Sequence, residues 1–300
     1  PASKIVTDPA SDAEVGYTTR VFVQALFPYK SSTELVHQIQ QGPVKVTVVA
    51  SDGLPYGKYP RLIMAYVVTQ AVARAGMAQR GELSQEEARR IPFGNSLNEF
   101  LRAIGLTTRG GGKVIENIRM QVDRLAACSI KVENVAKTAL STQREAKPTM
   151  DISHRHELWL THNPDHGALH DSFLELTEEF FSELVAHPIP VDLNVLNRLG
   201  RPRAMDIYTW LALKKYWLSH QTKKLASYTF DWDVMENHFS PKTLTTWVEH
   251  RDLRNEMKKC LEAIEELWPQ MGAEVTKEGV VIYQGPTPVQ PTPRNPALEP

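Results

Sequence analysis

The sequence contains little cysteine and no long hydrophobic run. Cys128 and Cys260 are the only cysteines among 300 residues, and each sits inside an apolar helical pattern. Two isolated cysteines cannot form the disulfide framework of a small secreted domain and favour a reducing cytoplasm. No window approaches the roughly 18 uncharged apolar residues that a membrane-spanning helix needs. We therefore expect a cytoplasmic protein that makes no use of a membrane.

The chain also lacks an excess of charge of either sign. Its 34 Lys and Arg residues against 35 Asp and Glu residues give a formal net charge of −1. A strongly basic balance would indicate nucleic acid, so any DNA-binding surface here must be local. With 42% hydrophobic residues in 300, the chain is long enough to form two domains, each with its own core.

The motifs of several enzyme classes are absent as well. Gly110 to Lys113 is too short for a phosphate-binding loop, and a turn before a helix is the preferred interpretation. The sequence has neither paired cysteines nor a His-Glu-x-x-His motif for zinc. We expect a protein that is not an enzyme and that needs no cofactor and no metal.

One segment keeps a metal-dependent alternative open. A His-x-His pattern in a strand puts both rings on one face, as in nickases that cut one DNA strand. However, the middle residue is Arg155, and Tyr208 and Tyr216 fit apolar helix faces rather than a nucleophile's position. A loop with incidental histidines is preferred over a nickase, while adventitious metal binding or a pH-sensitive linker stays possible. The five histidines of this segment are His154, His156, His162, His166 and His170.

The order of elements in the first half is typical of a winged helix. A short helix, a Gly-rich turn and a longer helix are followed by a hairpin with a long polar tip over about 137–153. Ser96 is the expected N-cap of the short helix, and Gly105 its stop. The expected elements are strands 21–27 and 44–49, a helix from Pro60 to about 79, helices 97–104 and 114–128, and strands 129–134 and 157–161.

The second half repeats this order of helices followed by a hairpin. Thr177 and Asp192 are expected N-caps, and Gly200 and Pro269 are expected stops. Lys277 and Glu278 form the expected turn of the hairpin. The expected elements are strand 173–176, helices 177–186, 192–200, 203–218, 231–238 and 244–267, and strands 273–276 and 279–283.

These patterns predict an α+β, helix-rich fold made of tandem winged-helix modules, that is, two winged helix-turn-helix domains. Residues 1–19 are expected to be a flexible arm, and residues 284–300, with six prolines, a disordered tail. The first domain covers 20–163 and serves dimerisation and DNA binding. The second covers 172–283 and binds DNA, with the boundary near 163–172.

Two helices carry the candidate DNA-binding residues. In each, apolar residues occupy one face, so cations and amides on the other side can reach phosphates and base edges. Acidic residues are interleaved, especially in the later helix, and a solvated helix with ordinary charge pairs explains the charges about equally well. The candidates from the first half are Arg109, Lys113, Asn117, Arg119, Arg124 and Lys131. Those from the second half are Lys242, Arg251, Arg254, Asn255, Lys258 and Lys277.

Several sequence segments resemble the plasmid-encoded RepA family of replication initiators. The resemblance runs in collinear order over about residues 20 to 283, and the order is more specific than any single segment. The segments are 56–66 (Tyr-Gly-Lys-Tyr-Pro-Arg-Leu-Ile-Met-Ala-Tyr), 95–106, 118–130, 176–181, 187–193 and 204–211, followed by Trp232, Phe239 and Trp268-Pro269.

The resemblance implies a bacterial initiator that binds repeated double-stranded sites, called iterons, at its own plasmid's origin. It also implies that the protein helps to open the DNA, recruits the host's replication initiator and replicative helicase, and exists as both monomer and dimer. A winged-helix transcriptional regulator or partition protein, which binds operator DNA as a dimer, is the alternative. The residues alone fit either role.

Overall fold

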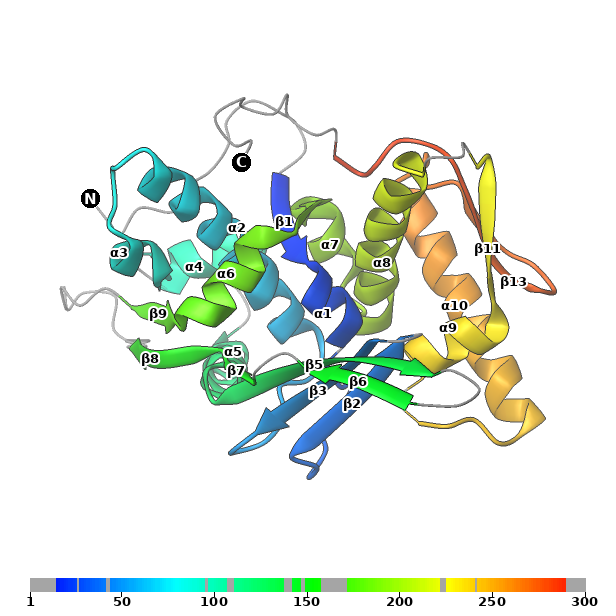
Figure 1. Cartoon of the computed structure of the whole chain (residues 1–300), viewed down its shortest axis with the longest axis horizontal. Helices are drawn as coiled ribbons and strands as arrows, with labels where there is room; N and C mark the ends of the chain where they lie inside the picture. The colour runs from blue at the N-terminus through cyan, green and yellow to red at the C-terminus, as the bar shows by residue number, and fades with distance from the viewer. Residues whose placement is uncertain are drawn as a thin grey trace.

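The computed structural model describes residues 15–25, 27–41, 44–94, 97–106, 111–137, 142–146, 149–157, 172–221, 225–240 and 242–289. Helices and antiparallel sheets from both halves of the chain share one apolar core. In Figure 1 the largest sheet lies below the helices of the first half, and the C-terminal helices and strands lie to one side.

The longest helix of the first half, α2 (Lys58–Gln79), lies at the centre of the molecule. It starts near Pro60, as predicted, because a proline in the first turn costs no hydrogen bond. Nearly every residue from Pro60 to Ala71 is buried, which is typical of a helix that is covered on all sides. The elements that pack against it include β1 (Val15–Thr19), α3 (Gln85–Arg89), α5 (Gly111–Ala126), α6 (Glu178–Ala186) and α8 (Pro202–Ser219).

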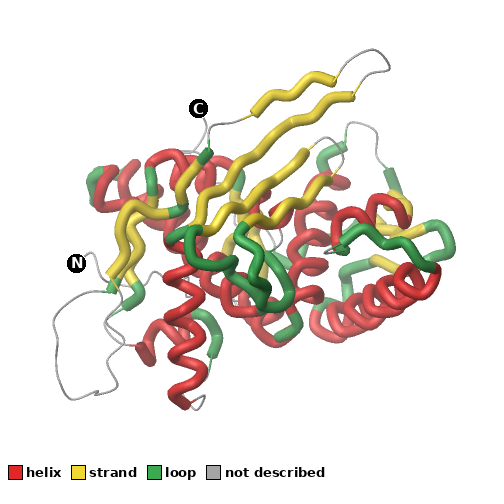
Figure 2. The backbone as a smooth tube through the Cα atoms, turned by 90° about the horizontal axis from the view of Figure 1, so that it is seen from below, coloured by secondary structure: helices red, strands yellow, loops and turns green. Residues whose placement is uncertain are grey.

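The largest sheet has five antiparallel strands. Their order is β2 (Val36–Gln41), β3 (Val44–Ala50), β5 (Cys128–Lys137) and β6 (Thr142–Ala146), and β7 (Met150–Asp151) also pairs with β5. Figure 2 shows the long strands lying side by side. The predicted strand over 44–49 is confirmed as β3, whereas β2 is an element that the sequence analysis missed.

A second sheet lies close to the helices of the first half. It has the order β4 (Arg90–Pro92), β9 (Phe173–Leu176) and β8 (Ser153–Glu157). A capping box between Ser84 and Glu87 starts the short helix before β4. The nearby helices are α3 (Gln85–Arg89), α4 (Leu97–Ala103), α5 (Gly111–Ala126) and α6 (Glu178–Ala186).

The second half confirms most of the predicted helix ends. Thr177 and Asp192 cap their helices with side-chain oxygens, and Gly200 takes the left-handed conformation with φ 59°. The third sheet has the order β11-β13-β12. The elements are β10 (Pro188–Asp192), α7 (Leu193–Leu199), α8 (Pro202–Ser219), β11 (Ser227–Asp231), α9 (Trp232–Phe239), α10 (Trp247–Leu267), β12 (Ala273–Val275) and β13 (Gly279–Tyr283).

Strand pairing and a buried ion pair are among the contacts that join the two halves. β1 (Val15–Thr19) pairs with β10, and β9 pairs with β4 although it lies in the range predicted for the second domain. Arg61 of α2 and Asp206 of α8 form a buried ion pair whose closest distance, Nε to Oδ1, is 2.7 Å. The division into domains at 163–172 stays a prediction.

Two predictions about the N-terminal region are wrong. Residues 20–25 form the helix α1 (Arg20–Ala25) and not the start of a strand over 21–27. Val21 and Val23 are buried where α1 packs on α8, β2 and β3, so tertiary packing overrides the strand preference of valine. Residues 15–19 of the expected arm form β1, while 1–14 lie outside the described residues.

The predicted hairpin after α5, between strands 129–134 and 157–161, is not the one in the structure. β5 pairs with β6 and β7, which fall in the stretch expected to be a polar tip, and β8 pairs with β9 instead. Residues 158–161 of the expected second strand, and 290–300 of the tail, lie outside the described residues. Val289 of the tail is buried. None of the described helices is long and apolar enough to cross a membrane.

Candidate nucleic-acid interface

The helix α10 begins with a strong local start signal, the N-cap residue Thr246. The Thr246 hydroxyl accepts a hydrogen bond from the Glu249 amide, and the Glu249 carboxylate accepts one from the Thr246 amide at 3.1 Å. Lys242 forms an ion pair with the same carboxylate. The hydrogen bond from Lys242, with those from the threonine amides, holds the pKa of Glu249 far below its usual range. Lys242 therefore helps to fix the start of α10.

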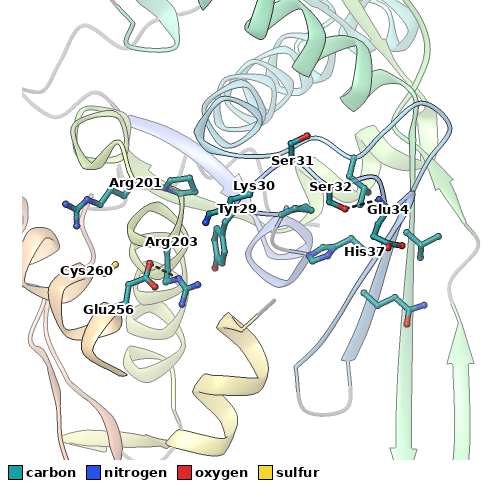
Figure 3. Close-up of a pocket in the computed structure, with 15 residues that line it drawn as sticks. Tyr29, Lys30, Ser31, Ser32, Glu34, His37, Arg201, Arg203, Glu256 and Cys260 are labelled. Carbon is teal, nitrogen blue, oxygen red and sulfur yellow. Dashed lines mark hydrogen bonds and ion pairs between the residues drawn. The ribbon is translucent and has the colours of Figure 1, made fainter. Parts of the chain in front are cut away.

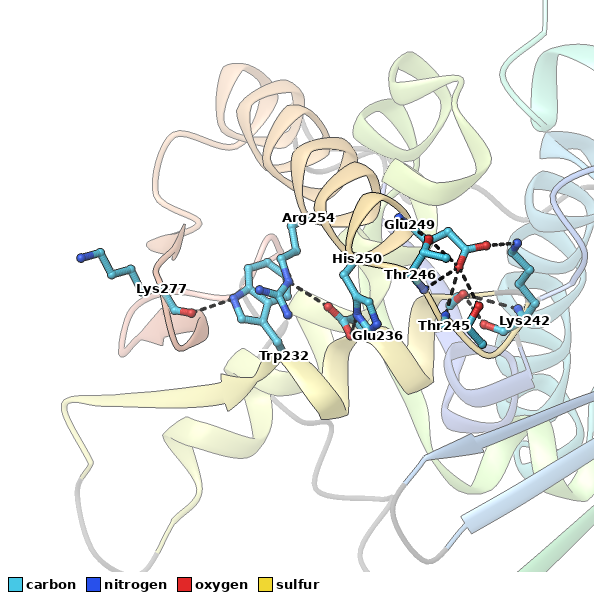
Figure 4. A network of polar contacts seen from close by, with 10 residues as sticks. Trp232, Glu236, Lys242, Thr245, Thr246, Glu249, His250, Arg254 and Lys277 are labelled. Atoms are coloured by element: carbon cyan, nitrogen blue, oxygen red, sulfur yellow. Dashed lines mark hydrogen bonds and ion pairs between the residues drawn. The ribbon is translucent and has the colours of Figure 1, made fainter.

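A buried carboxylate fixes the flank of α10. The side chain of Glu236 on α9 is 7% exposed and accepts hydrogen bonds from Arg254 Nε at 2.8 Å and from the ring of His250 at 2.6 Å. The Arg254 guanidinium also lies 4.8 Å from the ring centre of Trp232. Figure 4 shows these side chains joining the two helices. Arg254 is thus held against its own module.

The outward face of α10 carries the remaining candidates. Arg251, Asn255 and Lys258 are exposed. Arg251 pairs with the neighbouring Asp252 at 2.7 Å, but both side chains are exposed, and such pairs contribute little to stability. Lys258 has no ion-pair partner in the part of the chain that the structure describes. The predicted apolar face is confirmed, since Leu253, Met257, Cys260, Leu261, Ile264 and Trp268 are all buried.

The turn between β12 and β13 lies close to the start of α9. The indole nitrogen of Trp232 donates a hydrogen bond to the carbonyl oxygen of Lys277 at 3.1 Å, and the ammonium group of Lys277 points away from this contact (Figure 4). The Lys277 side chain is exposed. The confirmed hairpin therefore presents a cation at its tip.

The candidates on α5 are engaged to different degrees. Lys113 is exposed, and Arg119 is exposed but interacts with another residue. Asn117 is half-buried, and its Oδ1 has no hydrogen-bond partner among the described residues. Arg124 is turned inward, because its Nη1 donates to the Leu54 carbonyl oxygen at 3.1 Å.

Further contacts within the protein engage candidate cations of the first half, so fewer of them are available to bind DNA. Arg124 also lies 5.4 Å from the ring centre of Tyr56, on its own module. Lys131 on β5 forms an ion pair with Glu133 at 3.1 Å. Arg109 lies outside the described residues. The structure thus leaves Lys113 and Arg119 as the clearest outward cations of this group.

A cleft of about 920 Å³ lies between residues 28–38 and the helices α8 and α10. Figure 3 shows its lining, in which Lys30, Arg201 and Arg203 are mixed with Glu34 and Glu256. Arg203 lies within 3.3 Å of Glu256. Carboxylates among the cations oppose phosphate binding, so the cleft is a poorer DNA surface than α10.

Metal binding was an open alternative for the histidine-rich segment. No group of three or more possible metal ligands occurs among the described residues. His162, His166 and His170 lie outside them, so the alternative is not tested.

Comparison with known protein families shows the family to which the chain belongs. Residues 54–234, more than half of the chain, match the family described as plasmid encoded RepA protein. The chain belongs to this family. The match includes α2, α5 and α8 and most of the resembling segments, and it confirms the resemblance to RepA-family replication initiators. α10 and the C-terminal hairpin lie beyond the matched residues.

Solved structures add only distant similarities. Selenomethionine derivatives of domains 2 and 3 of RctB align with a TM-score of 0.46 and 10% identity, over 79% of this chain and 82% of theirs. Another structure of RctB domains 2–3 aligns with a TM-score of 0.44 and 13% identity, over 88% and 94%. At this level neither structure says what the chain does. None of the curated proteins compared with the chain matches it.

Proposed function

We propose that this chain is a cytoplasmic, bacterial initiator of plasmid replication. It binds repeated double-stranded sites at the plasmid's origin through two winged-helix modules, as a monomer in exchange with a dimer. It recruits the host's replication initiator and replicative helicase and performs no catalysis itself. Membership in the plasmid-encoded RepA family supports the role.

The strand order supports two modules of the same kind. The first module has a helix (α2), a strand (β4), two helices (α4 and α5) and two strands (β8 and β9). The elements α3 and β5 to β7 are inserted between them. In the second, α8, β11, α9, α10, β12 and β13 give the same order. In each sheet the last strand lies between the other two, as β4-β9-β8 and as β11-β13-β12. This shared order supports a winged-helix connectivity in both modules, although the two halves share no obvious sequence repeat.

The observation that carries the DNA-binding proposal is the outward face of α10. In a winged helix the second helix of the helix-turn-helix pair enters the major groove, and its N-terminal residues contact base edges. Here Arg251, Asn255 and Lys258 are exposed on that helix, with Lys277 on the adjacent hairpin. Guanidinium and amide groups read base edges, and ammonium groups contact phosphates. α5 would hold Lys113 and Arg119 towards a second groove.

The test is the salt dependence of binding to an origin duplex, measured by fluorescence anisotropy. Replacing Lys258 by Ala should reduce the slope of log K against log salt by about 1, because one phosphate contact is lost. The matched control is Arg80→Ala, which removes one charge from an exposed ion pair near the end of α2. An unchanged slope for Lys258→Ala would exclude α10 as the phosphate-contacting surface.

An operator-binding regulator is the second candidate function. The same outward face of α10 fits this function equally well. The two functions are therefore distinguished by the arrangement of the binding sites on the DNA. An initiator binds several direct repeats, whereas a dimeric regulator binds one inverted repeat.

A further inference from the structure

Two large apolar side chains lie exposed on the first turn of α10. Trp247 is 73% exposed and Val248 is 48% exposed, although apolar side chains on such a helix normally face the core. Thr246 caps the helix directly before them, so their backbone is fixed. The exposed apolar surface is therefore a rigid feature of the helix start.

These side chains share the face that carries the polar candidates. At the helical period, residues 247, 248, 251, 255 and 258 fall within about 100° of one another, on an arc separate from the buried face. The Arg251 guanidinium lies 5.1 Å from the ring centre of Trp247, so the indole also orients this cation. An arginine, an amide and two apolar groups thus point outward together.

Charge along α10 indicates which end meets DNA. Residues 247–259 contain four Lys or Arg and three Asp or Glu, whereas residues 260–267 contain three Glu and no Lys or Arg. Phosphates attract the first segment and repel the second. Glu236 fixes the rotation of the first segment through Arg254 and His250. The end with Trp247 and Val248 is therefore the end that fits a groove of DNA.

In the major groove, the apolar group that a protein can contact on a base edge is the 5-methyl group of thymine. We propose that Trp247 and Val248 contact thymine methyl groups and so make α10 specific for a thymine-containing step beside the base pair that Arg251 contacts. Arg254 and Glu236 act as positioning residues. This proposal rests on the proposed DNA-binding function and names the bases that it reads.

The experiment replaces each thymine of the origin duplex in turn by deoxyuridine, which removes only the methyl group. At one or two positions the wild-type protein should lose about fourfold in affinity per contacted methyl group. Trp247→Ala or Val248→Ala should abolish the difference between thymine and deoxyuridine at the same position, and Trp247→Phe should keep part of it. Val49→Ala, which alters an equally apolar and exposed side chain on β3, should keep it fully.

The outcomes separate this proposal from the function on which it rests. If the wild-type protein binds the origin but no deoxyuridine weakens binding, or both Ala variants keep full sensitivity, methyl recognition is wrong and initiation stands. If the Ala variants keep their DNA affinity and lose self-association instead, the patch is a contact between copies. If the wild-type protein does not bind origin DNA specifically, the proposed function fails as well. Unchanged thermal midpoints verify that the variants fold.

Discussion

Replacing Arg61 by Met should strongly destabilise the protein. Arg61 Nε and Nη2 donate to the two carboxylate oxygens of Asp206, both at 2.7 Å, and both side chains are buried. Burial alone would lower the pKa of Arg61, but Asp206 more than offsets this and raises it. The methionine leaves the carboxylate of Asp206 buried without these two donors.

The expected loss is about 3–5 kcal/mol of unfolding free energy, because a buried charge loses its partner. Arg61 also donates to the carbonyl oxygens of Gly57 and Phe27, each at 2.6 Å, and these bonds add about 1 kcal/mol each. Asp206→Leu should be costly too, since it leaves the guanidinium unpaired. The double variant Arg61→Met/Asp206→Leu should lose at least about 2 kcal/mol less than the sum of the single variants.

Urea unfolding followed by tryptophan fluorescence measures these losses. The control is Arg80→Met, in which an exposed ion pair with Glu82 is removed and at most about 1 kcal/mol is expected. If Arg61→Met unfolded within about 1 kcal/mol of the wild type, or if the two substitutions were additive, the ion pair between α2 and α8 would not hold the halves together.

Two further predictions test local features. Gly105 has φ 73°, and an added Cβ would lie 2.3 Å from the side-chain nitrogen of Asn197, so Gly105→Ala should cost about 1–3 kcal/mol. Gly81→Ala, with φ 74° and no atom within 4 Å, should cost less in the same unfolding assay, and equal losses would refute the steric contribution. Burial, together with the charge of Lys214, lowers the pKa of His238 to about 3. Below about pH 6.5 the unfolded chain therefore binds a proton that the native protein does not, and stability should fall by up to about 1.4 kcal/mol per pH unit as the pH drops towards 3. His238→Gln should flatten this slope between pH 6.5 and 5, and an unchanged slope would contradict the burial.

Elements with local signals could be predicted from the sequence. Helical periodicity and caps such as Thr177 and Asp192 depend on neighbours within a few residues, so their positions agree with the structure. β1 was not predicted, because its partner β10 lies far along the chain and its five residues form too short a segment to show a clear alternation. α1 was predicted as a strand because its valines favour strands, whereas its packing on α8, β2 and β3 favours the helix.

The candidate site was predictable as a set of helices but not as a surface. The helical wheel separates the buried face of α10 from its outward face. It does not say that Arg254 is bound to Glu236, which is 18 residues away, or that Arg124 reaches Leu54, which is 70 residues away. Counting charges treats these engaged cations and the exposed Lys258 alike. The wheel places Trp247 at the edge of the apolar face, so the sequence alone did not show that its side chain is exposed.

The most direct test of a two-module replication initiator is a footprint on the DNA that flanks the protein's own gene. We expect several protected sites with the same orientation and regular spacing, each covered by one chain, with the two helices α5 and α10 in neighbouring major grooves. A single inverted repeat protected by a dimer would contradict initiation and favour a regulator.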